Sequence, residues 1–172
     1  MVAGPSGVGK SCVAKALEDQ HSFMHIDIDQ NHPFQANGFP SEWDNDIRNV
    51  DFTKLASFVR DRLASEGHSS AVVSFPTVHV FSVQQIQTAA IAGISTVVLW
   101  GTEANCIEAR RKRAKDNRVK FDLERYKRKN QPTFETYAQS DYAPYRIETF
   151  KPDGSRVPIE RIVVAIIERM SG

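Results

Sequence analysis

An eight-residue segment near the start of the chain limits its fold more than any other feature. It reads Gly4-Pro5-Ser6-Gly7-Val8-Gly9-Lys10-Ser11 and matches the pattern G-x-x-x-x-G-K-[ST] at every fixed position. In sequences of average composition, a chain this long would contain such a match by chance in fewer than roughly 1% of cases. An apolar lead over residues 1–3 precedes the segment, and a predicted helix over residues 12–19 follows it. The order strand, glycine-rich loop and helix predicts a phosphate-binding loop.

The residue types in this loop suit the chemistry of a bound triphosphate. Glycines allow backbone N–H groups to curl round a phosphate with no side chain in the way, and the helix that follows points its positive dipole end at the anion. Lys10 is expected to reach the β and γ phosphates, and the hydroxyl of Ser11 is expected to hold Mg²⁺. The expected cofactors are therefore ATP and Mg²⁺. The predicted nucleotide-binding residues are Gly4, Pro5, Ser6, Gly7, Val8, Gly9, Lys10, Ser11, Cys12, Arg110 and Pro152; Cys12 is expected to be buried in the first helix.

Strand-like and helix-like segments alternate along the rest of the chain. Such alternation predicts an α/β protein with a parallel sheet covered by helices on both faces. The expected strands are residues 1–3, 23–26, 71–75, 96–100 and 145–150. The expected helices are residues 12–19, 52–63, 79–92, 103–139 and 159–167, with the long charged segment 103–139 broken near Asn117 and at Pro132.

Length and composition favour one ordinary globular domain over residues 1–172. Hydrophobic residues make up 41% of the chain and charged residues 25%, and the net charge is +1. The chain as a whole is therefore no nucleic-acid polycation. The longest apolar runs fall far short of the ~20 residues of a membrane helix, and two cysteines without a CxxC pair indicate neither a disulfide framework nor a zinc site. We expect a cytoplasmic protein that is a monomer or a weak homodimer.

Two acids follow the second predicted strand, in the segment Asp27-Ile28-Asp29. In an extended segment residues i and i+2 point to the same side, and the carboxyl end of this strand should lie beside the phosphate-binding loop. Phosphoryl transfer needs an acid that organises Mg²⁺ and a base that orients the attacking hydroxyl. We therefore predict that Asp27 reaches the metal through water and that Asp29 is the catalytic base. The alternative is a solvated pair of loop acids.

These motifs together resemble the shikimate kinase and gluconate kinase group of small P-loop kinases. The stretch Asp27-Ile28-Asp29-Gln30-Asn31-His32-Pro33 is similar to the gluconate kinase pattern D-x-D-x-x-H-P, and the loop itself is also similar to that of guanylate kinase. The resemblance implies a three-layer P-loop NTPase fold with a five-stranded parallel sheet in the order 2-3-1-4-5 and a helical lid. It also implies that His32 contacts the acceptor and that residues 28–50 form an acceptor-binding insertion. Ser74-Phe75-Pro76-Thr77 matches neither family's segment after strand three, so neither acceptor is carried over.

A strongly basic stretch occupies the place where these kinases carry their lid. Residues 110–129 hold eleven Lys or Arg against three acids, a local excess of eight positive charges. Arg110 and Arg113 lie three apart and should share a helix face, where lid arginines clamp the phosphoryl group that is transferred. We predict both as catalytic residues within a lid region over 103–139, with Arg118 at the tip. A solvated charged face is the alternative reading for most of these cations.

The sequence favours an ATP-dependent kinase that transfers the γ-phosphoryl group to a hydroxyl of a small molecule. The turn at residues 151–155 resembles the one that holds adenine in these kinases, and a plain turn is its alternative. A nucleoside or nucleotide monophosphate kinase and an RNA-end kinase remain open as further alternatives. Nucleic acid is the less favoured partner because the basic stretch holds only two aromatic residues for base stacking, Phe121 and Tyr126. A switch GTPase is disfavoured, since neither D-x-x-G after strand three nor N-K-x-D is present.

Overall fold

A five-stranded, all-parallel sheet forms the centre of the molecule. The computed structural model describes residues 1–28, 39 and 50–171, and its strands lie in the order β2-β3-β1-β4-β5. The predicted fold class and strand order are thereby confirmed. The strands are β1 (Val2–Ala3), β2 (Met24–Asp27), β3 (Ala71–Ser74), β4 (Val97–Trp100) and β5 (Arg146–Glu148).

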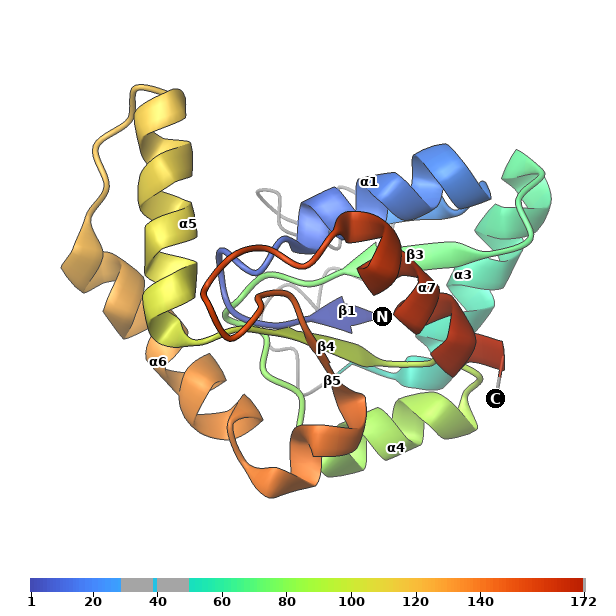
Figure 1. The fold of residues 1–172 in the computed structure, drawn as a ribbon. Helices are drawn as coiled ribbons and strands as arrows, with labels where there is room; N and C mark the ends of the chain where they lie inside the picture. The colour runs from blue at the N-terminus through green and yellow to red at the C-terminus, as the bar shows by residue number, and fades with distance from the viewer. Residues whose placement is uncertain (29–38, 40–49, 172) are drawn as a thin grey trace.

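Helices cover both faces of this sheet and make three layers (Figure 1). The first and last helices pack on each other on one face, and α3 and α4 pack on each other on the opposite face. α5 extends away from the sheet, and the chain returns along α6 (Figure 1). The helices are α1 (Lys10–His21), α3 (Phe52–Glu66), α4 (Val83–Ile91), α5 (Glu103–Asp116), α6 (Leu123–Tyr137), the 3-10 helix η3 (Ser140–Tyr145) and α7 (Ile159–Ser171).

Successive side chains of the strands pack alternately into two hydrophobic cores, one on each face of the sheet. Val97 and Leu99 of β4 lie in the core under α1 and α7, whereas Val98 between them lies in the core under α3 and α4. Successive side chains of a strand point to opposite faces, so an unbroken apolar run is what a strand buried on both faces requires. This burial holds the carboxyl ends of β1 and β4 side by side, which is where the phosphate-binding loop begins.

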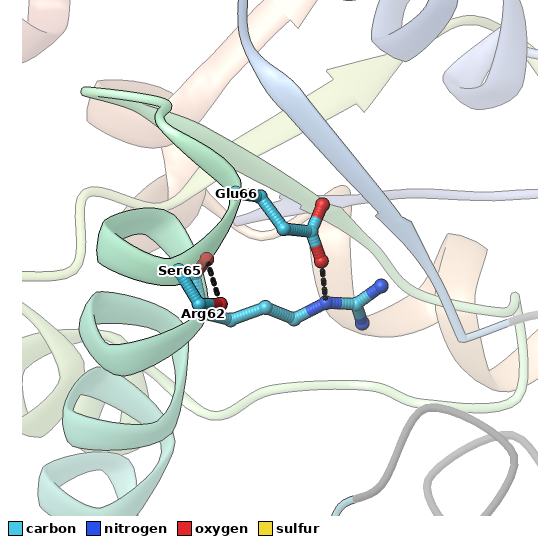
Figure 2. A network of polar contacts seen from close by, with 3 residues as sticks. All are labelled: Arg62, Ser65 and Glu66. Carbon is cyan, nitrogen blue, oxygen red and sulfur yellow. Dashed lines mark hydrogen bonds and ion pairs between the residues drawn. The ribbon is translucent and has the colours of Figure 1, made fainter.

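Local sequence signals account for where the helices begin and end. Asp51 caps α3 by accepting hydrogen bonds from the amides of Thr53 and Lys54, and Gly67 ends that helix at φ 74°. Near the same end, Arg62 Nε donates to Glu66 Oε1 at 2.7 Å (Figure 2). Exposed pairs of this spacing contribute only about 0.3–0.5 kcal/mol, so this contact does not decide the position of α3.

The predicted break at Pro132 is wrong, whereas the break at Asn117 is confirmed. α5 ends at Asp116, but α6 runs without interruption from Leu123 to Tyr137 with Pro132 inside it. Proline removes one backbone hydrogen bond and usually kinks a helix. Here Asn130, Thr133 and Tyr137 on either side of Pro132 are buried and bonded to other parts of the chain, which fixes the helix on both sides of the proline.

Most of the predicted acceptor-binding insertion, residues 28–50, lies outside the described residues. Ile28, Phe39 and Val50 are described, and all three are buried in the core under α3 and α4. Phe39 packs on Phe58 of α3 with ring centroids 4.1 Å apart. The division into a nucleotide-binding part, an insertion and a lid stays a prediction. No helix in the described ranges is long and apolar enough to cross a membrane.

Candidate active site

The phosphate-binding loop is the tight connection between β1 and α1. Gly4 and Gly7 have φ values of 135° and 101°, in the region that favours glycine. A Cβ atom at Gly4 would lie 2.2 Å from the carbonyl oxygen of Leu99, and one at Gly7 would lie 2.5 Å from that of Cys106. Glycine is therefore required at both positions for two reasons. The backbone has a positive φ, and β4 at Gly4 or α5 at Gly7 lies too close to leave room for a Cβ atom.

Three successive amides of this loop have no hydrogen-bond partner among the residues that the structure describes. No described atom accepts a hydrogen bond from the N–H of Gly7, Val8 or Gly9. Gly9 is also the N-cap of α1, and no side chain caps that helix end. Unpaired N–H groups at a helix N-terminus are the usual setting for a bound anion. The loop thus fits a phosphate group, as its sequence pattern predicts.

Lys10 folds back over the loop. Its Nζ donates hydrogen bonds to the carbonyl oxygens of Gly4, at 2.8 Å, and Pro5, at 3.2 Å, and lies 3.5 Å from Thr77 Oγ1. The ammonium group is therefore held at the mouth of the loop by acceptors that a phosphate oxygen could replace. Thr77, which follows β3, is thereby brought to the same place as the loop.

The two residues after Lys10 face solvent. Ser11 is exposed, so its hydroxyl is accessible to a metal ion. Cys12 is also exposed, so the prediction that it is buried is wrong. The reason is helical spacing, because α1 packs against the sheet with Val13, Ala14, Ala16 and Leu17 and leaves position 12 on its outer side.

Asp27 ends β2 within a short polar chain. Ser74 of β3 donates its hydroxyl to Asp27 Oδ1 at 3.2 Å, and His25 Nε2 lies 2.9 Å from the same hydroxyl oxygen. Because the Ser74 proton goes to the carboxylate, His25 Nε2 must donate to Ser74, which fixes the tautomer of the imidazole. Asp27 is half-buried at the carboxyl edge of the sheet. Asp29 and His32, the other predicted residues here, lie outside the described residues.

Ser11 and Asp27 are the two predicted metal ligands, and the structure describes both. Among the described residues, no group of three or more His, Cys, Asp or Glu side chains is placed to hold a metal ion. Mg²⁺ commonly binds through one or two protein ligands together with phosphate oxygens and water. A single hydroxyl from Ser11 and a carboxylate from Asp27 would suit that mode. Neither residue's role is tested by the structure, so both stay predictions.

The predicted lid forms a basic cavity beside the loop. A cavity of about 600 Å³ lies between α5 and α6, and both Arg110 and Arg113 line it together with Ser6 of the loop and Thr77 after β3. Among the described residues, five cations line the cavity against one acid, Asp122, whose side chain caps α6. The cations are Arg110, Arg113, Lys120, Arg125 and Lys129.

Arg110 packs directly against the loop. A Cβ atom at Gly7 would lie 3.2 Å from Arg110 Cγ, so the stem of this arginine packs on the loop itself. Its Nε is buried and has no hydrogen-bond partner in the described part of the chain. A buried donor left unpaired is costly, and an anion in the cavity would satisfy it. Arg113 is exposed, and Arg118 lies at the tip with φ 54°.

A buried polar stripe along α6 is the main feature that the sequence analysis missed. Its four residues, spaced i, i+4, i+7 and i+11, each bond backbone groups beside the site. Tyr126 Oη donates to the carbonyl of Ser6 at 2.7 Å, and the Ser6 amide donates to Asn130 Oδ1 at 2.7 Å. The others are Thr133, which donates to the carbonyl of Thr77, and Tyr137, which accepts from the amide of Phe81. The sequence signal that could have predicted this stripe is the helical spacing of four residues that carry hydroxyl or amide groups.

Arg156 is the second feature that the sequence analysis missed. It follows the predicted adenine-binding turn, and its guanidinium donates to the carbonyl oxygens of Gly7 and Val8, the latter at 2.8 Å. Pro152, in the turn itself, is exposed, and its role stays a prediction. No pattern in the sequence marks Arg156, because its two bonding partners lie 148 and 149 positions earlier in the chain.

Burial keeps two groups around the loop protonated. It raises the pKa of the Cys106 thiol to about 12, so this cysteine stays neutral under the loop at ordinary pH. Burial also raises the pKa of Tyr126, which keeps its hydroxyl proton available for Ser6. Neither group is therefore a nucleophile or a base, and both act through packing and hydrogen bonds.

No protein-family model matches the sequence, and no curated protein matches it. Among solved structures, a gluconokinase from Sinorhizobium meliloti 1021 matches with a TM-score of 0.56 and 20% identity, covering 99% of this chain and 89% of that chain. A shikimate kinase from Acinetobacter baumannii in complex with shikimate has a TM-score of 0.48 with 16% identity, over 97% of this chain and 89% of that one. A deoxyadenosine kinase from M. mycoides has a TM-score of 0.47 with 11% identity, over 99% and 97%. The likeness to the gluconokinase shows that this chain has the fold of the small P-loop kinases.

Proposed function

We propose that the protein is an ATP-dependent kinase that transfers the γ-phosphoryl group to a hydroxyl of a small molecule. The observation that carries the proposal is that one cavity is shared by the phosphate-binding loop and the basic lid. Ser6 of the loop and Arg110 and Arg113 of α5 line it together. A donor cradle on one side and cations on the other suit a reaction in which negative charge is spread over a phosphoryl group.

The residues of the loop divide the work of binding. The amides of Gly7, Val8 and Gly9 would donate to phosphate oxygens, and Lys10 would leave the carbonyls of Gly4 and Pro5 to reach the β and γ phosphates. Mg²⁺, held by Ser11 directly and by Asp27 through water, would neutralise charge on the phosphates when bound.

The lid and the acidic pair would serve the transfer step. Arg110 and Arg113 would stabilise the charge on the phosphoryl group as it moves, and closure of α5 and α6 would exclude water. Asp29 is proposed as the base that orients the acceptor hydroxyl, a role that rests on its position two residues after Asp27. His32 is proposed to contact the acceptor, and Pro152 the adenine, both from the resemblance of their segments.

Replacing Lys10 tests the proposal directly. Lys10→Ala removes the cation that would bind the phosphates, so we expect affinity for Mg²⁺ADP to fall by roughly 100-fold, the loss of one or two charged hydrogen bonds. Isothermal titration calorimetry measures this. Lys15→Ala is the matched control, because Lys15 lies on the same helix and its ammonium group pairs with the exposed Asp19 on the surface. Equal affinities for the Lys10 variant and the unmodified protein would rule the proposal out.

A coupled assay of ADP release would identify the acceptor. Sugars, polyols, nucleosides and nucleoside monophosphates are offered in turn with Mg²⁺ATP. A true acceptor raises ADP release above the rate with water alone, and that increase should vanish in Lys10→Ala. Turnover with water alone in every case would mean that the protein hydrolyses ATP and is no kinase.

A further inference from the structure

Three successive carbonyl groups of the loop are bound by side chains from distant elements. Tyr126 Oη of α6 donates to the carbonyl oxygen of Ser6 at 2.7 Å. The guanidinium of Arg156, beyond β5, donates through Nη2 to the carbonyl of Gly7 and through Nη1 to that of Val8, the latter at 2.8 Å. No residue of the G-x-x-x-x-G-K-[ST] pattern takes part as a donor in these contacts.

These carbonyls belong to the same peptide units as the unpaired amides. A peptide unit is planar and trans, so its C=O and N–H point in opposite directions. Bonds from Tyr126 and Arg156 to the carbonyls of Ser6, Gly7 and Val8 therefore point the N–H groups of the next residues, Gly7, Val8 and Gly9, away from these two side chains. Those are the three amides without a partner in the described chain.

A glycine-rich loop needs such support. Glycine has the widest choice of backbone conformations, so a loop free to sample them must lose that freedom when it binds a ligand. Donors fixed in place before binding avoid this cost. Two of the three bonds come from one charged, forked side chain, which is the strongest kind of hydrogen-bond donor to two adjacent oxygens.

Contacts outside the loop also hold the Arg156 side chain in place. Its guanidinium lies over the ring of Phe150, 4.0 Å from the centroid, and the two residues form an antiparallel bridge across the turn. The turn is closed by the hydrogen bonds of Lys151 to Ser155 and of Gly154 to Lys151. Burial lowers the pKa of Arg156, but an arginine retains its charge at any physiological pH.

We propose that Arg156 and Tyr126 are positioning residues of the nucleotide site, which hold the peptide units of the loop with their N–H groups turned toward the phosphates. The inference rests on the proposed function, because the ligand is the nucleotide of that reaction. Neither side chain needs to touch the nucleotide, and their effect should therefore depend on phosphate groups and not on the base.

Single substitutions separate positioning from general stability. Arg156→Lys keeps the charge but cannot donate to two adjacent carbonyls, and Tyr126→Phe removes one hydroxyl without changing the ring. The matched controls are Arg161→Lys, at an exposed position of α7, and Tyr145→Phe, whose hydroxyl bonds no described atom. The melting temperature of every variant is measured first, so that a loss of folding is detected.

Calorimetry with two ligands then provides the test. Mg²⁺ADP carries a base, whereas magnesium tripolyphosphate carries only phosphates. We expect Arg156→Lys to weaken both ligands by the same factor of about ten, and Tyr126→Phe by about three- to tenfold, as for one charged and one neutral hydrogen bond. Both controls should bind like the unmodified protein. The amide NMR signals of Val8 and Gly9 in the ligand-free protein should shift in Arg156→Lys.

Each remaining outcome overturns the inference. Unchanged tripolyphosphate affinity in both variants, with or without a lower melting temperature, would make these residues merely structural. Weaker Mg²⁺ADP with unchanged tripolyphosphate would mean that Arg156 contacts the base. If the unmodified protein binds neither ligand, the proposed function itself fails, and that result is distinguishable because it does not depend on any variant.

Discussion

The phosphate-binding loop and the tip of the predicted lid are built in opposite ways. The loop, residues 4–9, is bound by β4, α5, α6 and Arg156. The tip, residues 117–120, is exposed, and its backbone bonds reach only to the end of α5. α5 itself buries one residue, Cys106, among its 14 residues.

This difference predicts how binding and turnover are divided within the proposed site. Backbone amides held by several elements provide donors that need no rearrangement when a phosphate arrives, which favours binding. Cations on a hairpin with few buried contacts can move, which suits a part that closes once the substrates are bound. We therefore expect changes in the loop to affect affinity and stability, and changes in the lid to affect turnover.

The largest effect is expected where the loop packs on α5, the helix that leads to the tip. Gly7→Ala places a Cβ atom against the carbonyl of Cys106 and forces alanine to a φ of 101°, so we expect the free energy of unfolding to fall by roughly 2–5 kcal/mol. Urea denaturation measures this. Gly67→Ala is the control, because it has a positive φ but nothing within 4 Å of the added atom, and it should cost about 1 kcal/mol. Equal losses at both sites would mean that α5 does not pack tightly on the loop.

A smaller effect, confined to turnover, is expected from the lid arginines. Arg110→Ala and Arg113→Ala should each lower kcat by about tenfold or more while leaving the affinity for Mg²⁺ADP within about threefold, because in the proposed function their charge acts on the transferred phosphoryl group. Steady-state kinetics with the acceptor found by the screen measures this. Lys112→Ala, on the same helix but not lining the cavity, should keep its kcat. An unchanged kcat in both arginine variants would make these residues surface charges.

The smallest effect is expected at the lid tip. Arg118 has a φ of 54°, a conformation that favours glycine. Arg118→Gly should therefore raise the free energy of unfolding by up to about 1 kcal/mol, less the entropy that glycine loses on folding. Denaturation and kinetics on the same sample measure stability and kcat together. A lower stability would show that the Arg118 side chain makes contacts that outweigh the backbone strain, and a large fall in kcat would place it in the reaction.

Much of the fold was predictable because its signals are local. The buried strand Val97–Trp100 reads as a continuous apolar run, and α3 shows helical spacing with a stop at Gly67. The break at Asn117 was also visible in the sequence, whereas continuation through Pro132 was not, because it depends on Asn130 and Tyr137 bonding segments far away in the chain. Cys12 was misjudged for a related reason, since which side of α1 faces the sheet is set by packing.

By itself, the sequence determined the α/β architecture, the phosphate-binding loop and the basic segment opposite it, because period, glycine placement and charge are properties of neighbouring residues. Only the tertiary structure decided that Arg110 packs on Gly7, that the cations of α5 and α6 share a cavity with Ser6, and that Tyr126 and Arg156 hold the carbonyls of the loop. These contacts join residues more than 100 positions apart, and pairings at such separations follow from how the helices and the sheet pack, which no local pattern encodes.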